Sequence, residues 1–263
     1  MEVRMYPNMR RPNVGMKPKR EAQRPLLPQH ARHCPVLEAG SAIGFMVYPP
    51  IAPNESYHLE YQGDGRYRFI YYVRNKTGGW DALFAVVMTL PLGGSGKANE
   101  EVVFLTSVPA TSRENALLIA RTCMVPQDTG TPAGALALRG ATNFATPAGW
   151  DTVYSPIFNQ IERPVAPMLI VRVETDWYAH ETEFRYVLQP GEGISGEHTV
   201  PIGQVFFIPR EEITLRECTD EEMAALRQSM EAFAEEKAKV QLTTPYGLTY
   251  SPHYLRRSRS QKP

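Results

Sequence analysis

The sequence predicts a mainly β protein: a β-sandwich or jelly-roll body with one short helix, one long C-terminal helix and extended arms at both ends. Its composition supports this, because 23 prolines, 19 glycines, 13 tyrosines and 10 phenylalanines in 263 residues favour short strands joined by turns. About ten short segments also have strand-like patterns. These segments do not alternate regularly with helices, which disfavours a Rossmann or TIM architecture.

Residues 1–33 are expected to form an extended, proline-rich basic arm, because prolines recur every few residues and exclude a long helix. The arm has a net charge of +6 and residues 254–263 carry +4, so residues 34–253 of this neutral chain carry −10. The basic ends could stay solvated, or meet protein, nucleic acid or lipid. The candidate partner-binding residues are Arg10, Arg11, Lys17, Lys19, Arg20, Arg24, Arg256, Arg257 and Arg259.

A hairpin gives the clearest strand signal. Gly63-Asp64-Gly65 has the composition of a tight turn, and in the strand after it a mostly basic face alternates with Tyr67, Phe69 and Tyr71. Period two places the aromatic residues on one face, which we expect to be core. The predicted strands are residues 41–48, 57–62, 66–74, 83–90, 101–107, 135–139, 152–155, 168–176, 183–188, 204–208 and 213–217.

Two helices are predicted from capping-box spacing. Thr111 with Glu114 opens a helix that ends near Cys123, and Thr219 with Glu222 opens a long one. The long helix has an apolar stripe, interpreted as packing on the sheet, with a helix–helix dimer contact as the alternative. The stripe consists of Met223, Leu226, Met230, Phe233 and Val240. The predicted organisation is an arm (1–33), a β-sandwich domain (34–218), an amphipathic helix packed on it (219–240) and an extended basic tail (241–263).

Several common chemistries lack support. Gly93 to Lys97 resembles a phosphate-binding loop, but Pro91 and Ala98 stand where that motif needs a glycine and a hydroxyl residue. No G-x-S-x-G nucleophile elbow occurs. Nucleotide binding and acyl-transfer catalysis are therefore not expected, and no cofactor is expected.

Cysteine usage and hydropathy favour a cytoplasmic protein. Cys34, Cys123 and Cys218 form no C-x-x-C pair, which is typical of free thiols in a reducing compartment. No apolar run approaches the length of a membrane-spanning helix, and no apolar segment of a signal peptide follows the N-terminal arginines.

The segment Met168 to Trp177 carries the densest charge pattern. As a central strand it would place Arg172, Glu174 and Asp176 on one face. That face either is exposed to solvent, where its ion pairs contribute little to stability, or lines a polar pocket in which the pKa values of the carboxylates are perturbed.

The sequence gives only a weakly specific indication of a metal site. His180, Glu183 and His198 could form a 2-His-1-carboxylate set, although histidines in surface loops are the simpler interpretation. The segment Gly196 to Phe206 is similar to the second conserved box of the cupins, which implies a jelly roll. Phe206 stands where metal-binding cupins have a histidine, so the resemblance argues against the standard cupin metal site.

Three segments between residues 143 and 210 resemble, in order, an uncharacterised family of bacterial and phage proteins. They are Thr146 to Trp150 (T-P-x-G-W), Val173 to Trp177 (V-E/D-T-D-W/Y) and Pro201 to Arg210 (G-x-P-x-x-Q-x-I-P-x-R). The third departs from the family pattern, since Pro201 precedes Gly203 instead of following a glycine. The family has no assigned activity, so the resemblance implies no catalytic residues.

The residues of these three segments either shape turns of the scaffold or line a ligand-binding slot. The candidate ligand-binding residues are Trp150, Arg172, Glu174, Asp176, Trp177 and Arg210. The leading hypothesis is a non-catalytic structural protein whose body and basic arms bind partner subunits or further copies in a larger complex. The alternatives are a jelly-roll non-haem metal enzyme (an oxygenase or isomerase) with a pocket near Glu174 and Asp176, and binding of nucleic acid or lipid through the arms.

Overall fold

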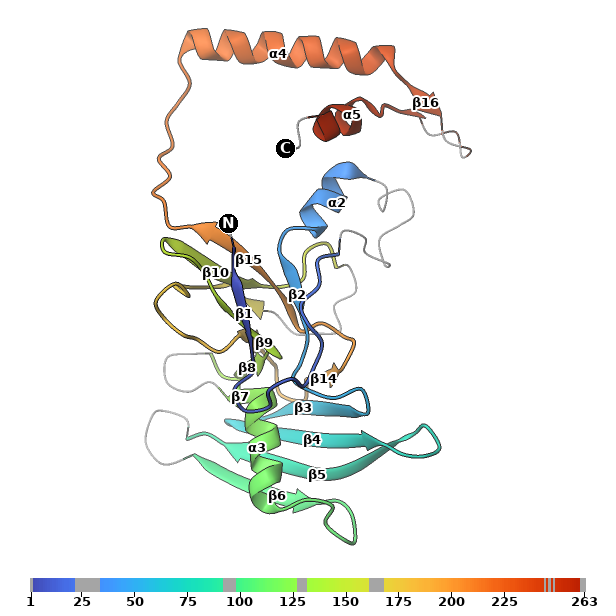
Figure 1. Ribbon diagram of the computed structural model, residues 1–263, viewed down its shortest axis with the longest axis vertical. Helices are drawn as coiled ribbons and strands as arrows, with labels where there is room; N and C mark the ends of the chain where they lie inside the picture. The colour runs from blue at the N-terminus through green and yellow to red at the C-terminus, as the bar shows by residue number, and fades with distance from the viewer. Residues whose placement is uncertain are drawn as a thin grey trace. The chain divides into compact units, whose positions relative to one another are not determined.

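The computed structural model describes residues 2–21, 34–91, 98–126, 132–160, 168–243, 245, 247 and 249–260. The chain forms two compact units, one within Met1–Arg32 and Leu37–Arg210, the other within His33–Val36 and Glu211–Pro263. The first unit is mainly β, as predicted, and its described residues form antiparallel sheets, most of helix α2 (Pro35–Ser41) and helix α3 (Arg113–Cys123) (Figure 1). Arg24 and residues 93–97, which resemble a phosphate-binding loop without completing its motif, lie outside the described residues.

The largest sheet has five antiparallel strands in the order β14-β3-β4-β5-β6. Asp64 and Gly65 have φ values of 49° and 72° in the turn between β3 and β4, which confirms the predicted hairpin. Tyr67, Phe69 and Tyr71 are buried, so the aromatic face is the core face. The strands are β3 (Glu55–Gly63), β4 (Arg66–Arg74), β5 (Trp80–Thr89), β6 (Asn99–Phe104) and β14 (Gly193–Glu197).

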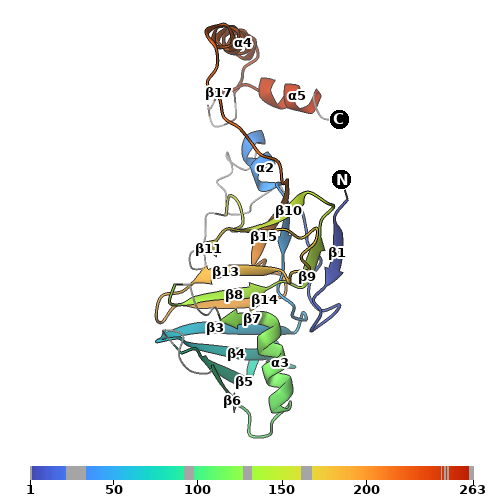
Figure 2. The ribbon, with the colours of Figure 1, turned by 90° about the vertical axis from the view of Figure 1, so that its left-hand side faces the viewer.

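Two four-stranded sheets, ordered β12-β10-β15-β2 and β11-β13-β8-β7, complete most of this unit (Figure 2). Helix α3 packs against β5, β6, β7 and β8. Buried side chains of the five-stranded sheet, of β8 and β13 and of α3 belong to one hydrophobic core. The strands are β2 (Phe45–Val47), β7 (Met124–Pro126), β8 (Ala135–Arg139), β9 (Thr142–Ala145), β10 (Trp150–Ser155), β11 (Met168–Leu169), β12 (Val171–Val173), β13 (Glu183–Val187) and β15 (Gly203–Pro209).

The prediction of one central strand over 168–176 is wrong. β11 pairs with β13 and β12 pairs with β10, so the chain passes from one sheet to the other at Ile170. Both short strands lie at the edges of their sheets. A period-two pattern cannot show such a switch, because each short strand still alternates.

Part of the N-terminal arm belongs to the first unit. β1 (Arg4–Pro7) pairs antiparallel with β9, and Asn8 is fully buried, with its side-chain amide donating to the Gly140 carbonyl at 3.1 Å. Lys19 forms an antiparallel bridge with Met46 of β2.

The second unit holds α4 (Asp220–Lys239), the short strands β16 (Leu242–Thr243) and β17 (Thr249–Tyr250), and α5 (His253–Ser260). The predicted capping box of Thr219 and Glu222 is present at the start of α4. The strand predicted over 213–217 is not formed, and the tail predicted to be extended contains a helix. None of the described helices is long and apolar enough to cross a membrane.

Candidate functional site

A buried carboxylate, Asp151 of β10, is the centre of a cluster of ion pairs in the first unit. Its side chain is only 1% exposed, and two guanidinium groups bind it. Arg172 of β12 donates from Nε to Oδ2 at 2.5 Å, and Arg210, just after β15, donates from Nη2 to Oδ1 at 2.5 Å. The cluster thus joins three chain segments far apart in sequence.

Arg210 links this buried acid to the turn that follows β12. Its Nη2 donates to Asp176 Oδ1 at 2.7 Å, and its Nε lies 3.4 Å from Glu174 Oε1. The Gly149 amide donates to Asp176 Oδ2 at 2.9 Å, and the Arg210 amide donates to the Gly149 carbonyl at 2.7 Å. Arg210 therefore anchors the chain at the last residue of the first unit.

The cluster keeps its acids ionised. Burial opposes ionisation of Asp151, but hydrogen bonds from Arg210 and Arg172 outweigh it and hold its pKa below the usual range. Hydrogen bonds from Arg210 and the Gly149 amide likewise lower the pKa of Asp176. The same contacts with Asp151 and Asp176 raise the pKa of Arg210. A carboxylate with a lowered pKa is a weaker base than usual and stays ionised at neutral pH, so the geometry suits anchoring better than acid–base catalysis.

The structure brings the predicted slot residues together. Arg172, Glu174, Asp176 and Arg210 join the ion cluster, the Trp177 indole donates to Glu174 Oε2 at 2.8 Å, and half-buried Trp150 precedes Asp151. Sequence reasoning missed Asp151 itself. The available signal was an acid inside the otherwise uncharged strand of residues 150–155, where a buried carboxylate requires paired cations.

The residues of the alternative metal set take other partners. Glu183 Oε1 lies 3.3 Å from Arg139 Nε, and His198 Nδ1 lies 2.7 Å from the Ile51 carbonyl oxygen. His180 packs against Tyr178, with ring centroids 5.3 Å apart. Among the residues that the structure describes, no three metal-ligating side chains gather.

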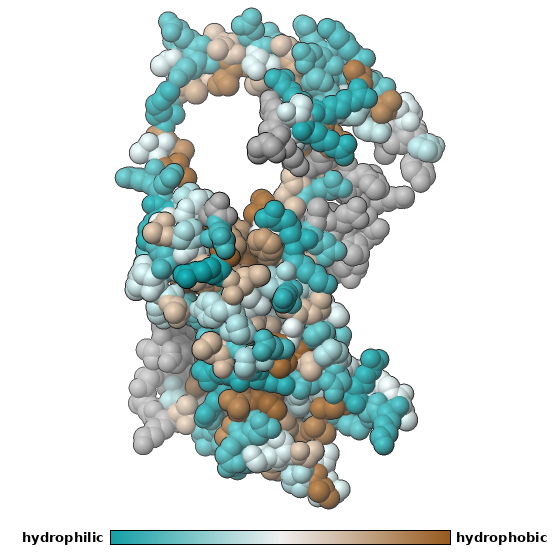
Figure 3. Space-filling model, in the orientation of Figure 1, coloured by the Kyte–Doolittle hydropathy of each residue, from teal (hydrophilic) through white to brown (hydrophobic). Residues whose placement is uncertain are grey.

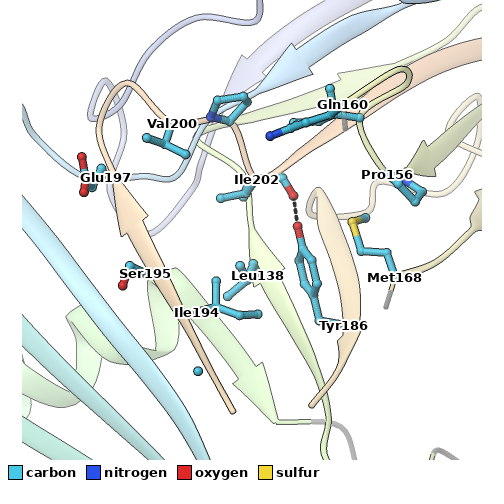
Figure 4. Close-up of a pocket in the computed structure, with 13 residues that line it drawn as sticks. Leu138, Pro156, Gln160, Met168, Tyr186, Ile194, Ser195, Glu197, Val200 and Ile202 are labelled. Atoms are coloured by element: carbon cyan, nitrogen blue, oxygen red, sulfur yellow. Dashed lines mark hydrogen bonds between the residues drawn. The ribbon is translucent and has the colours of Figure 1, made fainter. Parts of the chain in front are cut away.

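A cavity of about 350 Å³ lies beside β14. Leu138, Ile194 and Ile202 form buried apolar parts of its wall, and the Tyr186 hydroxyl donates to the Ile202 carbonyl (Figure 4). Its described lining includes no residue of the predicted ligand slot. The charged slot residues are thus joined by ion pairs, and none of the slot residues belongs to the described lining of this cavity.

Several candidate partner-binding residues of the N-terminal arm contact other residues of the same chain. Arg11 makes a bidentate contact with Glu55, at 2.8 and 2.9 Å, and donates to the Pro50 carbonyl. Arg10 Nε lies 3.5 Å from Glu181 Oε1. The Arg20 guanidinium lies 4.8 Å from the centroid of the Phe45 ring, whereas Lys17 is exposed.

The C-terminal unit presents a different surface. Three side chains on one side of α4, Met223, Leu226 and Met230, are 40%, 52% and 71% exposed, and we call them the α4 stripe. Hydrophobic residues are visible along α4 among hydrophilic ones (Figure 3). Nearer the end of α4, Phe233 packs against His253 of α5 with ring centroids 4.9 Å apart. Arg256, Arg257 and Arg259 are exposed on α5, with the Arg257 guanidinium 5.9 Å from the Phe233 ring centroid.

Searches of known protein families, curated proteins and solved structures found no match to this chain.

Proposed function

We propose that this protein is a structural, assembly-type protein in which α4 binds a helix of a partner. In this proposal the β-rich unit is a sandwich-like body, and the C-terminal unit is the connecting element. The joint core of the five-stranded sheet with β8 and β13 supports the sandwich-like description.

The uncovered α4 stripe is the observation that carries this proposal. None of the residues of α4 is buried. The contacts of α5 with α4 lie farther along the helix, where His253 Nε2 is 3.1 Å from Glu236 Oε2. Three adjacent apolar side chains on a charged helix match the helix-in-groove mode of recognition, in which such residues insert between those of a partner.

The ordered start of α4 supports the same function. The Thr219 hydroxyl accepts from the Glu222 amide at 3.3 Å, and the Glu222 carboxylate accepts from the Thr219 amide at 2.9 Å. Arg216 adds two charge-assisted bonds to that carboxylate. These contacts stabilise the first turn of α4 without using the stripe, and a helix that is formed before binding loses less conformational entropy on binding.

Leu226→Glu tests whether α4 serves assembly or instead packs on its own body. All three tryptophans, Trp80, Trp150 and Trp177, belong to the first unit, so tryptophan fluorescence reports that unit alone. In dilute protein we expect Leu226→Glu to leave the urea midpoint of the fluorescence transition unchanged. Gln228→Glu is the control, because it adds the same charge on another side of the helix. A lower midpoint in Leu226→Glu, but not in Gln228→Glu, would show that the stripe packs on the chain's own β-rich unit.

A further inference from the structure

The pattern along α4 points to its partner: we propose that α4 pairs with α4 of a second copy of this chain, side by side and in parallel. This inference rests on the proposed assembly function and adds the partner and its orientation.

The spacing of the stripe is that of a coiled-coil seam. Positions 223, 226, 230, 233, 237 and 240 recur at intervals of three and four residues, which gives them a and d positions in successive heptads. Met223, Leu226 and Met230 are the exposed members, whereas α5 contacts Phe233 and Lys237 occupies the next a position. The contact is therefore centred on the N-terminal half of α4.

The charges beside the seam favour a second copy in parallel. Glu222 occupies the g position before Met223 and Arg227 the e position after Leu226, five residues apart. In a parallel pair the g residue of one helix lies beside the next e residue of the other, so Glu222 of each copy meets Arg227 of its partner. An antiparallel pair centred on Leu226 would instead bring the two Arg227 side chains together.

Glu222 stays anionic and can accept a further cation. Hydrogen bonds from Arg216 and the Thr219 amide lower its pKa to about 2. Its carboxylate already accepts from Arg216 and the Thr219 amide, but its side chain is 42% exposed, which leaves space for Arg227 of a neighbouring helix beside these contacts. Because the same pair forms twice about a two-fold axis, the surface is complementary to itself.

Sedimentation velocity of the full-length protein tests self-association. Since only three apolar side chains per helix make the seam, we expect a monomer–dimer equilibrium in the micromolar range. Leu226→Glu should weaken dimerisation at least about tenfold, and Arg227→Glu should weaken it less, with a smaller effect at high salt. The control Gln228→Glu should dimerise like the wild type.

Disulfide crosslinking through Cys218 reports the relative orientation of the two α4 helices. It is exposed just before the helix, whereas Cys123 is buried, so Cys34→Ser leaves Cys218 as the one thiol available for crosslinking. In a parallel pair the two Cys218 residues lie at the same end, but in an antiparallel pair centred on Leu226 they are about 25 Å apart along the axis. Diamide, which takes up the two thiol hydrogens, should crosslink the Cys34→Ser protein into a disulfide-linked dimer. Adding Cys218→Ser should abolish the crosslink, and adding Leu226→Glu should strongly reduce its yield.

The outcomes separate this inference from the function on which it rests. A dimer that Leu226→Glu disrupts but diamide does not crosslink would overturn the parallel orientation. A monomer at all concentrations, with an unchanged urea midpoint in Leu226→Glu, would overturn the second copy as partner and leave assembly through another helix. If the protein is a monomer at all concentrations and Leu226→Glu lowers the urea midpoint, both proposals are overturned.

Discussion

At the scale of single residues, the molecule depends on a buried acid that is paired with two partly exposed arginines. Asp151 is fully buried, yet its carboxylate binds Arg172 and Arg210. A buried charge is costly unless it is paired and hydrogen-bonded, so this acid stabilises the fold only together with its two arginines. The cluster thereby holds the end of β15 to β10.

Asp151→Asn should lower the free energy of unfolding at neutral pH by about 1.5 to 3 kcal/mol, the usual range for a hydrogen bond to a charged group. The folded-state pKa of Asp151 is depressed, so its contribution is fully present above the unfolded pKa, about 4, and is lost as pH falls through the folded value. Urea titrations across this pH range should show the wild-type advantage shrinking below about pH 4.

Glu174→Gln is the control for that experiment. The Glu174 side chain is 45% exposed and its contact with Arg210 is long, at 3.4 Å, so the change should cost under about 1 kcal/mol. Equal losses of unfolding free energy in the two variants would show that the buried Asp151 contributes no more to stability than the exposed Glu174.

At the scale of elements, caps and turns determine where helices and strands begin. The Thr219 cap follows the sequence prediction, but α3 begins one residue later than its threonine indicated. The Ser112 hydroxyl accepts from the Asn115 amide at 3.2 Å, whereas the Thr111 hydroxyl accepts from the Asn115 side chain at 2.6 Å. Ser112 is therefore the N-cap of α3.

Replacing these two neighbours separately tests that assignment. Ser112→Ala should destabilise the protein by about 1 kcal/mol, because an end amide of α3 loses its acceptor. Thr111→Ala should cost under about 0.5 kcal/mol, since its bond joins two exposed side chains. Urea unfolding of both variants measures the difference, and the reverse order would place the cap at Thr111.

At the scale of the whole molecule, the basic N-terminal arm is partly interior structure. Arg11 and Glu55 form an ion pair, and their own side chains are only 18% and 13% exposed. The Ala52 amide also donates to Glu55. Hydrogen bonds from Arg11 and Ala52 outweigh the opposing effect of burial and lower the pKa of Glu55. This pair attaches the arm to the start of β3.

Arg11→Met should therefore destabilise the protein by about 3 kcal/mol, because it leaves the Glu55 carboxylate without its cation. Its neighbour Arg10 is the matched control, since its side chain is 39% exposed and its contact with Glu181 is 3.5 Å long. Arg10→Met should cost under about 1 kcal/mol in the same urea titration. Similar small losses in both variants would contradict an anchored arm.

The sequence by itself determined what depends on neighbouring residues: the β3–β4 hairpin, its aromatic core face, the Thr219 capping box and the apolar pattern of α4. These features follow from turn chemistry and side-chain periodicity, which act over a few residues. It also grouped Arg172, Glu174, Asp176 and Arg210 as candidate site residues. Only the tertiary structure decided that they surround Asp151, that Arg11 pairs with Glu55, and that the chain changes sheets at Ile170. Those outcomes depend on which distant strands pair and in which register, and local periodicity does not encode this.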